Sequence, residues 1–272
     1  MILALALWGS PALADDETLL NRPDAPVQLR LGGEIGFLAV LAHKIQFGGE
    51  GSNIDYVKEG GQDNLFAAVR LQAEVRSKRH SVILLYQPLD IQSDEIARRD
   101  LAVDGLVFPE GTPMQFRYRF PYYRASWMYD TAKRYDLEVS LGASLQIRNA
   151  RIDFTSLNGD LKRSNRNIGP VPVLKARIRK DFDNGWFVGG EADGFYAPIK
   201  YINGSDNDVE GAILDASLNF GRPVRPGAEF FFNLRYIGGG ASGTSSNPSN
   251  FTDGYTRNWL NFMVVSLGAT VF

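Results

Sequence analysis

Residues 114–122 read MQFRYRFPY, with apolar or aromatic side chains at the even positions and Gln or Arg at odd positions until a proline interrupts. A second run, residues 135–148, reads YDLEVSLGASLQIR and alternates in the same way with the parities swapped. Successive side chains of a strand point to opposite faces, so each run has one apolar face and one ionic face. A short turn at residues 130–134 joins the two runs, and we expect an antiparallel hairpin.

The length of these runs indicates a membrane protein. Strands of soluble sheets usually contain about 5–6 residues, whereas a tilted strand needs roughly 9–11 residues to cross a bilayer. We therefore expect the apolar face of each run to contact lipid and the ionic face to point into a barrel.

Composition excludes several other classes. The chain has 272 residues, a formal net charge of −2 and no cysteine. It has no apolar run of the roughly 18 residues that a membrane helix needs. Near-neutral charge argues against a nucleic-acid surface. The absence of cysteine excludes thiol catalysis, cysteine-ligated zinc and disulfides. No Pro/Ser-rich linker divides the chain, which favours a single barrel.

The first residues resemble an export signal. Residues 2–8 are apolar, and Ala12-Leu13-Ala14 is a small-x-small cleavage motif before Asp15. We expect residues 1–14 to be a signal peptide, residues 15–26 a periplasmic lead-in, and residues 27–272 the barrel.

Eight further runs complete the predicted strand set: 27–47, 65–76, 81–91, 168–182, 186–201, 212–220, 228–236 and 257–272. Connections after odd-numbered strands are long and polar, and those after even-numbered strands are short. The prediction is an all-β, closed, antiparallel, up-and-down transmembrane β-barrel of about ten strands. Eight or twelve strands are the alternatives, because residues 81–91 are apolar on both faces and contain Pro88. The polar segment after them, residues 92–112, can include a hairpin above the membrane.

A signal peptide, an even strand number, alternating short turns and long loops, and an aromatic Phe272 together resemble the bacterial outer-membrane β-barrel class. This resemblance implies a Gram-negative outer-membrane location, a lipid bilayer with lipopolysaccharide around the protein, and the barrel-assembly machinery as a partner. In that class the last strand usually ends in an aromatic residue with apolar residues at alternate positions before it. Here Thr270, Gly268 and Ser266 depart from that pattern.

Charged residues at the predicted inward positions nearly balance in sign, and a barrel of about ten strands is narrow enough for side chains to fill. We expect these groups to pair and to leave a largely ion-pair-filled lumen. The protein would then be a structural or narrow-channel barrel with polar extracellular loops. A selective small-solute porin lined by the arginines is the alternative. The predicted lumen-lining residues are Arg30, Glu34, Arg70, Glu74, Arg117, Arg119, Glu138, Arg148, Lys175, Arg177, Arg179, Glu191, Asp193, Asp215, Glu229 and Arg235.

Candidates for chemistry are few, so we assign no catalytic residue and no cofactor, and a non-enzyme is favoured. His43 shares its parity with the predicted lipid-facing residues and would be the histidine of a lipid-modifying hydrolase, the second alternative. Asp206, Asp208 and Glu210 offer oxygen ligands for calcium, although their spacing is generic. The run Gly238-Gly239-Gly240 is interpreted as flexible loop.

Overall fold

The computed structural model describes residues 27–132, 134–198, 208–244 and 253–272. The predicted signal peptide and lead-in, residues 1–26, lie outside the described residues. All regular elements of the described residues are strands, and no helix among them is long and apolar enough to cross a bilayer. The strands are β1 (Gln28–Phe47), β2 (Ile54–Asp55), β3 (Leu65–Ser77), β4 (His80–Gln87), β5 (Asp90–Ile96), β6 (Leu101–Val103), β7 (Leu106–Phe108), β8 (Pro113–Arg119), β9 (Tyr122–Asp130), β10 (Leu137–Ser156), β11 (Lys162–Asp181), β12 (Phe187–Pro198), β13 (Asp208–Arg225), β14 (Ala228–Thr244) and β15 (Tyr255–Val271).

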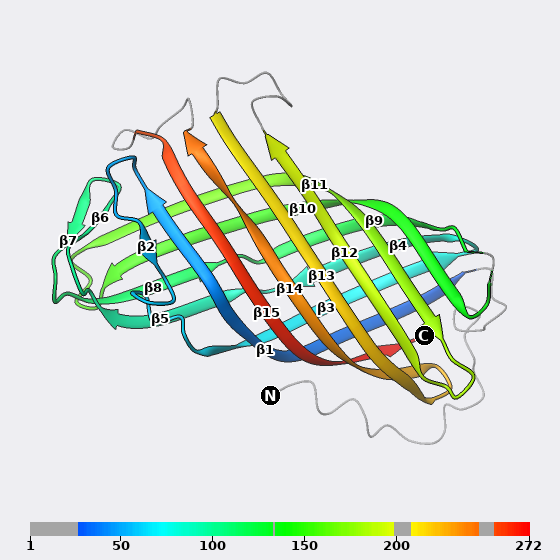
Figure 1. Ribbon diagram of the computed structural model, residues 1–272. Helices are drawn as coiled ribbons and strands as arrows, with labels where there is room; N and C mark the ends of the chain where they lie inside the picture. The colour runs from blue at the N-terminus through cyan, green and yellow to red at the C-terminus, as the bar shows by residue number, and fades with distance from the viewer. Residues whose placement is uncertain (1–26, 133, 199–207, 245–252) are drawn as a thin grey trace.

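These strands form a closed antiparallel barrel (Figure 1). Each long strand pairs with its neighbours in the chain, β15 pairs with β1, and β10 pairs with β11, so the ring has no open edge. Segments β4 and β5 form one barrel strand, and β8 and β9 form another, because β9 and β8 pair with successive parts of β10. The described residues therefore make ten barrel strands, as predicted.

The exterior of the barrel carries a wide apolar band. Alternate residues of nearly every long strand expose large apolar side chains on this face, whereas their sequence neighbours are buried and often polar. An apolar exterior around a polar interior is the arrangement that a bilayer requires, since hydrocarbon contacts the outside. Members of this band include Leu31, Ile35, Phe37, Leu71, Leu84, Trp127, Leu141, Leu174, Leu218, Phe232 and Leu267.

Above this band the exterior of the barrel is polar and the interior is apolar. The outer segment of the wall contains β5, β8 and the distal halves of β10 and β11 (Figure 1). There Phe116 and Tyr118 are fully buried inside the barrel, whereas Arg117 and Arg119 lie on the exterior. The prediction that residues 114–120 turn their apolar face to lipid was wrong. Water surrounds the wall at this level, so the apolar side chains pack inward.

A register shift between Val40 and Ala42 changes the direction of the side chains at the outer end of β1. Leu41 is exposed, but His43, Ile45 and Phe47 are all buried. A bulge inserts one residue into a strand and so reverses the faces beyond it. The parity argument that placed His43 on the lipid side is corrected for this reason.

The outer connections are more ordered than the sequence suggested. Residues 149–167 lie between two of the predicted strands, yet β10 and β11 run through most of them and leave a turn at residues 157–161. Strands β6 and β7 form a hairpin within the segment 92–112. Gly238, Gly239 and Gly240 belong to β14 rather than to a flexible loop. A side chain at Gly238 would collide with the Tyr236 ring, so glycine lets this ring lie flat against the wall.

Gly142 marks a place where two strands approach closely. A Cβ atom there would collide with the backbone carbonyl of Trp127 on β9, the neighbouring strand. We expect Gly142→Ala to destabilise the barrel by roughly 1–3 kcal/mol, the usual cost of overpacking. The measurement is urea unfolding in lipid vesicles, with Gly169→Ala as the control because a Cβ at Gly169 meets nothing within 4 Å. Equal losses for the two variants would contradict this account of Gly142.

Candidate functional site

The interior of the barrel at the level of the apolar band holds a network of charged side chains. Several of its ion pairs join strands that are not neighbours in the wall, so these pairs must cross the lumen. Arg177 of β11 donates to both carboxylate oxygens of Glu74 on β3, at 2.9 and 2.8 Å. Arg124 of β9 lies 3.1 Å from Asp215 of β13.

Asp215 is the centre of the network. Its carboxylate accepts hydrogen bonds from Arg235 at 2.6 Å, Arg124 at 3.1 Å and Arg70 at 3.3 Å. These donors come from β14, β9 and β3. Gln87 accepts hydrogen bonds from Arg70 and Tyr122, which extends the network to β4. A single carboxylate on β13 thus links three other strands, β3, β9 and β14.

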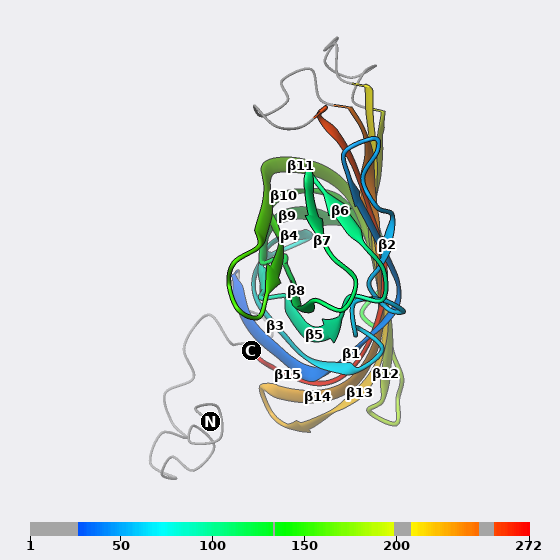
Figure 2. The ribbon, with the colours of Figure 1, turned by 90° about the vertical axis from the view of Figure 1, so that its left-hand side faces the viewer.

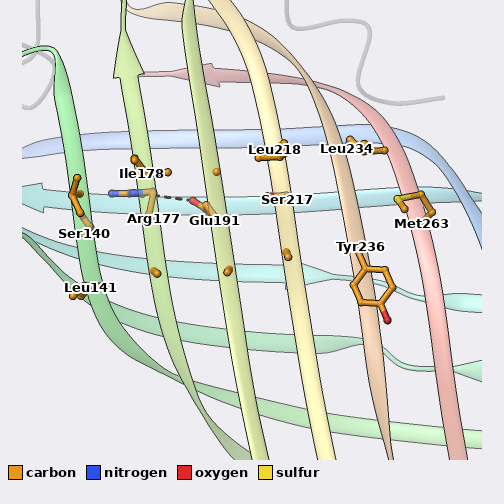
Figure 3. Close-up of a pocket in the computed structure, with 15 residues that line it drawn as sticks. Ser140, Leu141, Arg177, Ile178, Glu191, Ser217, Leu218, Leu234, Tyr236 and Met263 are labelled. Atoms are coloured by element: carbon orange, nitrogen blue, oxygen red, sulfur yellow. Dashed lines mark ion pairs between the residues drawn. The ribbon is translucent and has the colours of Figure 1, made fainter.

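A second group of charges surrounds Arg177. Besides Glu74, this guanidinium donates to Glu138 at 2.6 Å and lies 3.9 Å from Glu191. Figure 3 shows Arg177 and Glu191 on neighbouring strands, joined by this ion pair. Lys175 links Glu191 at 3.0 Å to Asp193 at 2.9 Å. Because Asp193 also pairs with Arg124 at 2.8 Å, the two groups form one continuous network.

A small cavity lies among these side chains. Towards the tight-turn end a cavity of about 70 Å³ remains, lined in part by Arg30, Glu74, Arg179 and Glu229. Such a volume holds a few water molecules. Arg179 donates to both oxygens of Glu229 at 2.9 Å, and Arg30 lies over the ring of Phe272 with its guanidinium carbon 4.8 Å from the ring centre.

An aromatic plug closes the lumen above the charged network. We use this name for Tyr56, Phe108, Phe116, Tyr118 and Phe154, which pack inside the outer end of the barrel. The connection that contains β2 supplies Tyr56, and the hairpin β6–β7 supplies Phe108. Figure 2 looks towards this end and shows β6 and β7 lying across part of the barrel mouth.

An ion pair ties the two plug-forming connections together on the surface. Arg99 donates to Glu59 through Nε at 2.8 Å and through Nη2 to the Asn53 carbonyl at 2.9 Å. The hydrogen bond from Arg99 lowers the pKa of the Glu59 carboxyl, so this link is ionised at neutral pH.

His43 lies inside the plug and has 0% exposed surface. Its Nδ1 is 2.9 Å from Gln62 Oε1, its Nε2 is 3.2 Å from Asn258 Oδ1, and the rings of Tyr56 and Tyr118 contact it edge-on. Hydrolysis requires a nucleophile beside the base and an approach for water. Two amide partners provide neither, so this geometry gives the hydrolase alternative no support.

The structure places the predicted lumen residues in three groups. Arg117 and Arg119 are on the exterior, which corrects their prediction; Arg117 pairs with Asp90 at 2.6 Å and Arg119 with Asp153 at 2.9 Å. Arg148 bonds to Asn167 high in the barrel. The others point inward at the level of the network: Arg30, Glu34, Arg70, Glu74, Glu138, Lys175, Arg177, Arg179, Glu191, Asp193, Asp215, Glu229 and Arg235.

Sequence reasoning missed Arg124 and Asp130. Both lie on β9, where the even positions point inward and all but Met128 carry a polar group, while Tyr123 and Trp127 are exposed. The polarity of the even positions after Pro121 was the available signal. Asp130 accepts from Arg76, which also donates to Glu138.

The structure describes the three predicted calcium ligands only in part. Asp206 lies outside the described residues, and Glu210 accepts a hydrogen bond from the Tyr196 hydroxyl at 3.0 Å. Asp208 begins β13. Within the ranges that the structure describes, no group of three His, Asp or Glu side chains is arranged to hold a metal ion.

An apolar groove of about 510 Å³ runs along the exterior wall across β10 to β15 (Figure 3). Its floor is formed by Ala176, Ala192 and Ala216, which oppose one another on β11, β12 and β13. Larger side chains such as Leu218 and Tyr236 border it.

No protein-family model and no curated protein matches the sequence. Solved structures match its fold at low identity. The outer membrane protease OmpT from Escherichia coli is 12% identical, with a TM-score of 0.48 over 90% of this chain and 96% of that one. The attachment invasion locus protein Ail of Yersinia pestis is 10% identical, with a TM-score of 0.36 over 89% and 98%. The toluene transporter TodX of Pseudomonas putida is 8% identical, with a TM-score of 0.35 over 93% and 91%.

The chain has the fold of a bacterial outer-membrane β-barrel. Closure without a free edge and an apolar exterior band are the two features that a strand protein needs in order to cross a bilayer. Both are present in the described residues, so the barrel has the features needed to cross a bilayer.

Proposed function

We propose that the protein is a non-conducting structural barrel that fixes its polar extracellular loops at the surface of a Gram-negative outer membrane. The observation that supports this proposal is the packing of side chains inside the barrel. Ion pairs join opposite strands at the level of the apolar band, and the aromatic plug lies above them. An ion would have to displace paired charges and then apolar rings, and both steps are costly.

The proposal includes processing and assembly. Residues 1–14 would be removed as a signal peptide, and the barrel-assembly machinery would insert the chain with β15 closing against β1. Lipid and lipopolysaccharide would surround the apolar band.

Planar-bilayer recording tests the closed lumen. We expect no conductance above background for the wild-type protein at 1 M KCl. The variant Arg124→Ala with Asp193→Ala removes the ion pair between these two residues (2.8 Å), together with the Arg124–Asp215 and Lys175–Asp193 pairs, without changing the net charge. Because this variant empties volume at the centre of the network, we expect its conductance to exceed that of wild type. Arg134→Ala with Asp136→Ala, an exposed pair at the β9–β10 turn, is the matched control and should remain silent. Wild-type conductance with solute selectivity would favour the porin alternative instead.

A further inference from the structure

A row of arginines crosses the exterior wall just above the apolar band. Arg119 on β8 is directly opposite Arg151 on β10, which is directly opposite Arg166 on β11. Directly opposed residues point to the same face, with Cβ atoms about 4.5–5.5 Å apart. We call these three residues the arginine row. Like charges in such positions repel unless anions lie between them.

The chain supplies too few anions for this row. Asp153 is shared by Arg119 and Arg151, each at 2.9 Å. Arg166 donates to the amide oxygen of Asn149 at 3.2 Å, and no carboxylate of the described residues pairs with it. The neighbouring exterior positions add Arg117 and Lys162 against Asp90 and Asp94. Five cationic groups therefore face three carboxylates on this part of the wall.

The surface directly below the row is apolar. The rings of Tyr86 and Tyr123 stack on the exterior with centroids 4.9 Å apart. Ile147, four residues before Arg151, is half-exposed, and Pro170 opposite it is exposed. Four residues of strand span about 13 Å, a separation that suits phosphate groups at the row and acyl chains at the apolar residues below it. Aromatic side chains favour that boundary.

We propose that the arginine row binds the phosphate groups of an anionic lipid of the outer leaflet, whose acyl chains lie against the apolar strip at Leu145, Ile147 and Pro170. Guanidinium groups bind phosphate oxygens through paired charge-assisted hydrogen bonds. A bound phosphate also supplies the anion that Arg166 lacks. The inference names the residues of a lipid site and does not depend on whether the lumen conducts.

Lipid titration followed by native mass spectrometry tests this site on the full chain in a neutral detergent. The probes are a bisphosphorylated acylated disaccharide, its dephosphorylated form and inorganic phosphate. We expect the double variant Arg151→Gln with Arg166→Gln to bind the bisphosphorylated lipid about tenfold more weakly than wild type, because two charged donors are lost. The control variant Arg98→Gln with Arg225→Gln changes the same net charge at exposed positions elsewhere and should bind within about twofold of wild type.

Unchanged affinity in the double variant would overturn the proposal. Equal binding of the dephosphorylated lipid, or displacement of the lipid by inorganic phosphate at equal concentration, would overturn it too. Should the double variant fail to fold, Arg166→Gln alone keeps the test, because its hydrogen bond goes only to Asn149. For this single variant we expect affinity to fall about threefold. The absence of conductance in planar-bilayer recordings would not change the lipid affinities expected here.

Discussion

Asp215→Asn is expected to destabilise the barrel by about 3–5 kcal/mol, the cost of removing one partner from a buried ion pair. The substitution keeps the size of the side chain but removes the charge that Arg70, Arg124 and Arg235 share. Arg124 keeps Asp193 at 2.8 Å, whereas Arg70 and Arg235 keep only the more distant Glu34, at 3.9 and 3.4 Å. Burial of insufficiently paired guanidinium groups is the physical reason for the loss.

Equilibrium unfolding by urea in lipid vesicles measures this loss through tryptophan fluorescence. Asp183→Asn, an exposed carboxylate in the β11–β12 turn, is the control and should stay within about 0.5 kcal/mol of wild type. The double variant Asp215→Asn with Arg235→Gln restores the charge balance. We expect its loss to be smaller than the sum of the two single losses, because the residues are in contact at 2.6 Å. Strict additivity would show that Asp215 does not organise the network.

The strand count and the lipid-facing band followed from the sequence because period-two alternation is a local property. In runs such as residues 137–147 one face points to lipid and the other to the polar interior over the whole length. The pattern therefore predicts both the strand and its faces. Pairing in the lumen was harder to foresee. Arg177 meets Glu74 across the barrel, 103 positions away in the chain, and no local pattern specifies that partner.

The prediction of which face points to lipid was wrong where the surroundings change along one strand. Alternation shows that two faces differ, but it does not say which one points inward. Phe116 and Tyr118 continue the inward face of Tyr122 and Arg124, yet they are apolar because the interior changes from an ion network to the aromatic plug. At His43 the cause is the register shift between Val40 and Ala42. No residue type in that apolar run indicates such a shift.

Leu267→Arg is expected to cost about 2–4 kcal/mol in vesicles, the penalty of a cation on the lipid face near the bilayer midplane. Leu267 is 67% exposed and lies midway along the apolar outward positions of β15, residues 263–271, opposite Ile35 and Phe232, which are also exposed. If water surrounded this face, an arginine there would be favourably hydrated and nearly neutral in effect. The cost therefore reports which solvent contacts the residue.

Leu157→Arg supplies the matched comparison, measured by the same urea unfolding. Leu157 is 56% exposed and lies in the β10–β11 turn above the apolar band, where water is the solvent. We expect this variant to remain within about 0.5 kcal/mol of wild type. The two variants make the same chemical change at similar exposure, so propensity and side-chain entropy largely cancel between them. A large cost at Leu267 with none at Leu157 follows only if hydrocarbon contacts the band, and equal small costs would remove the membrane assignment.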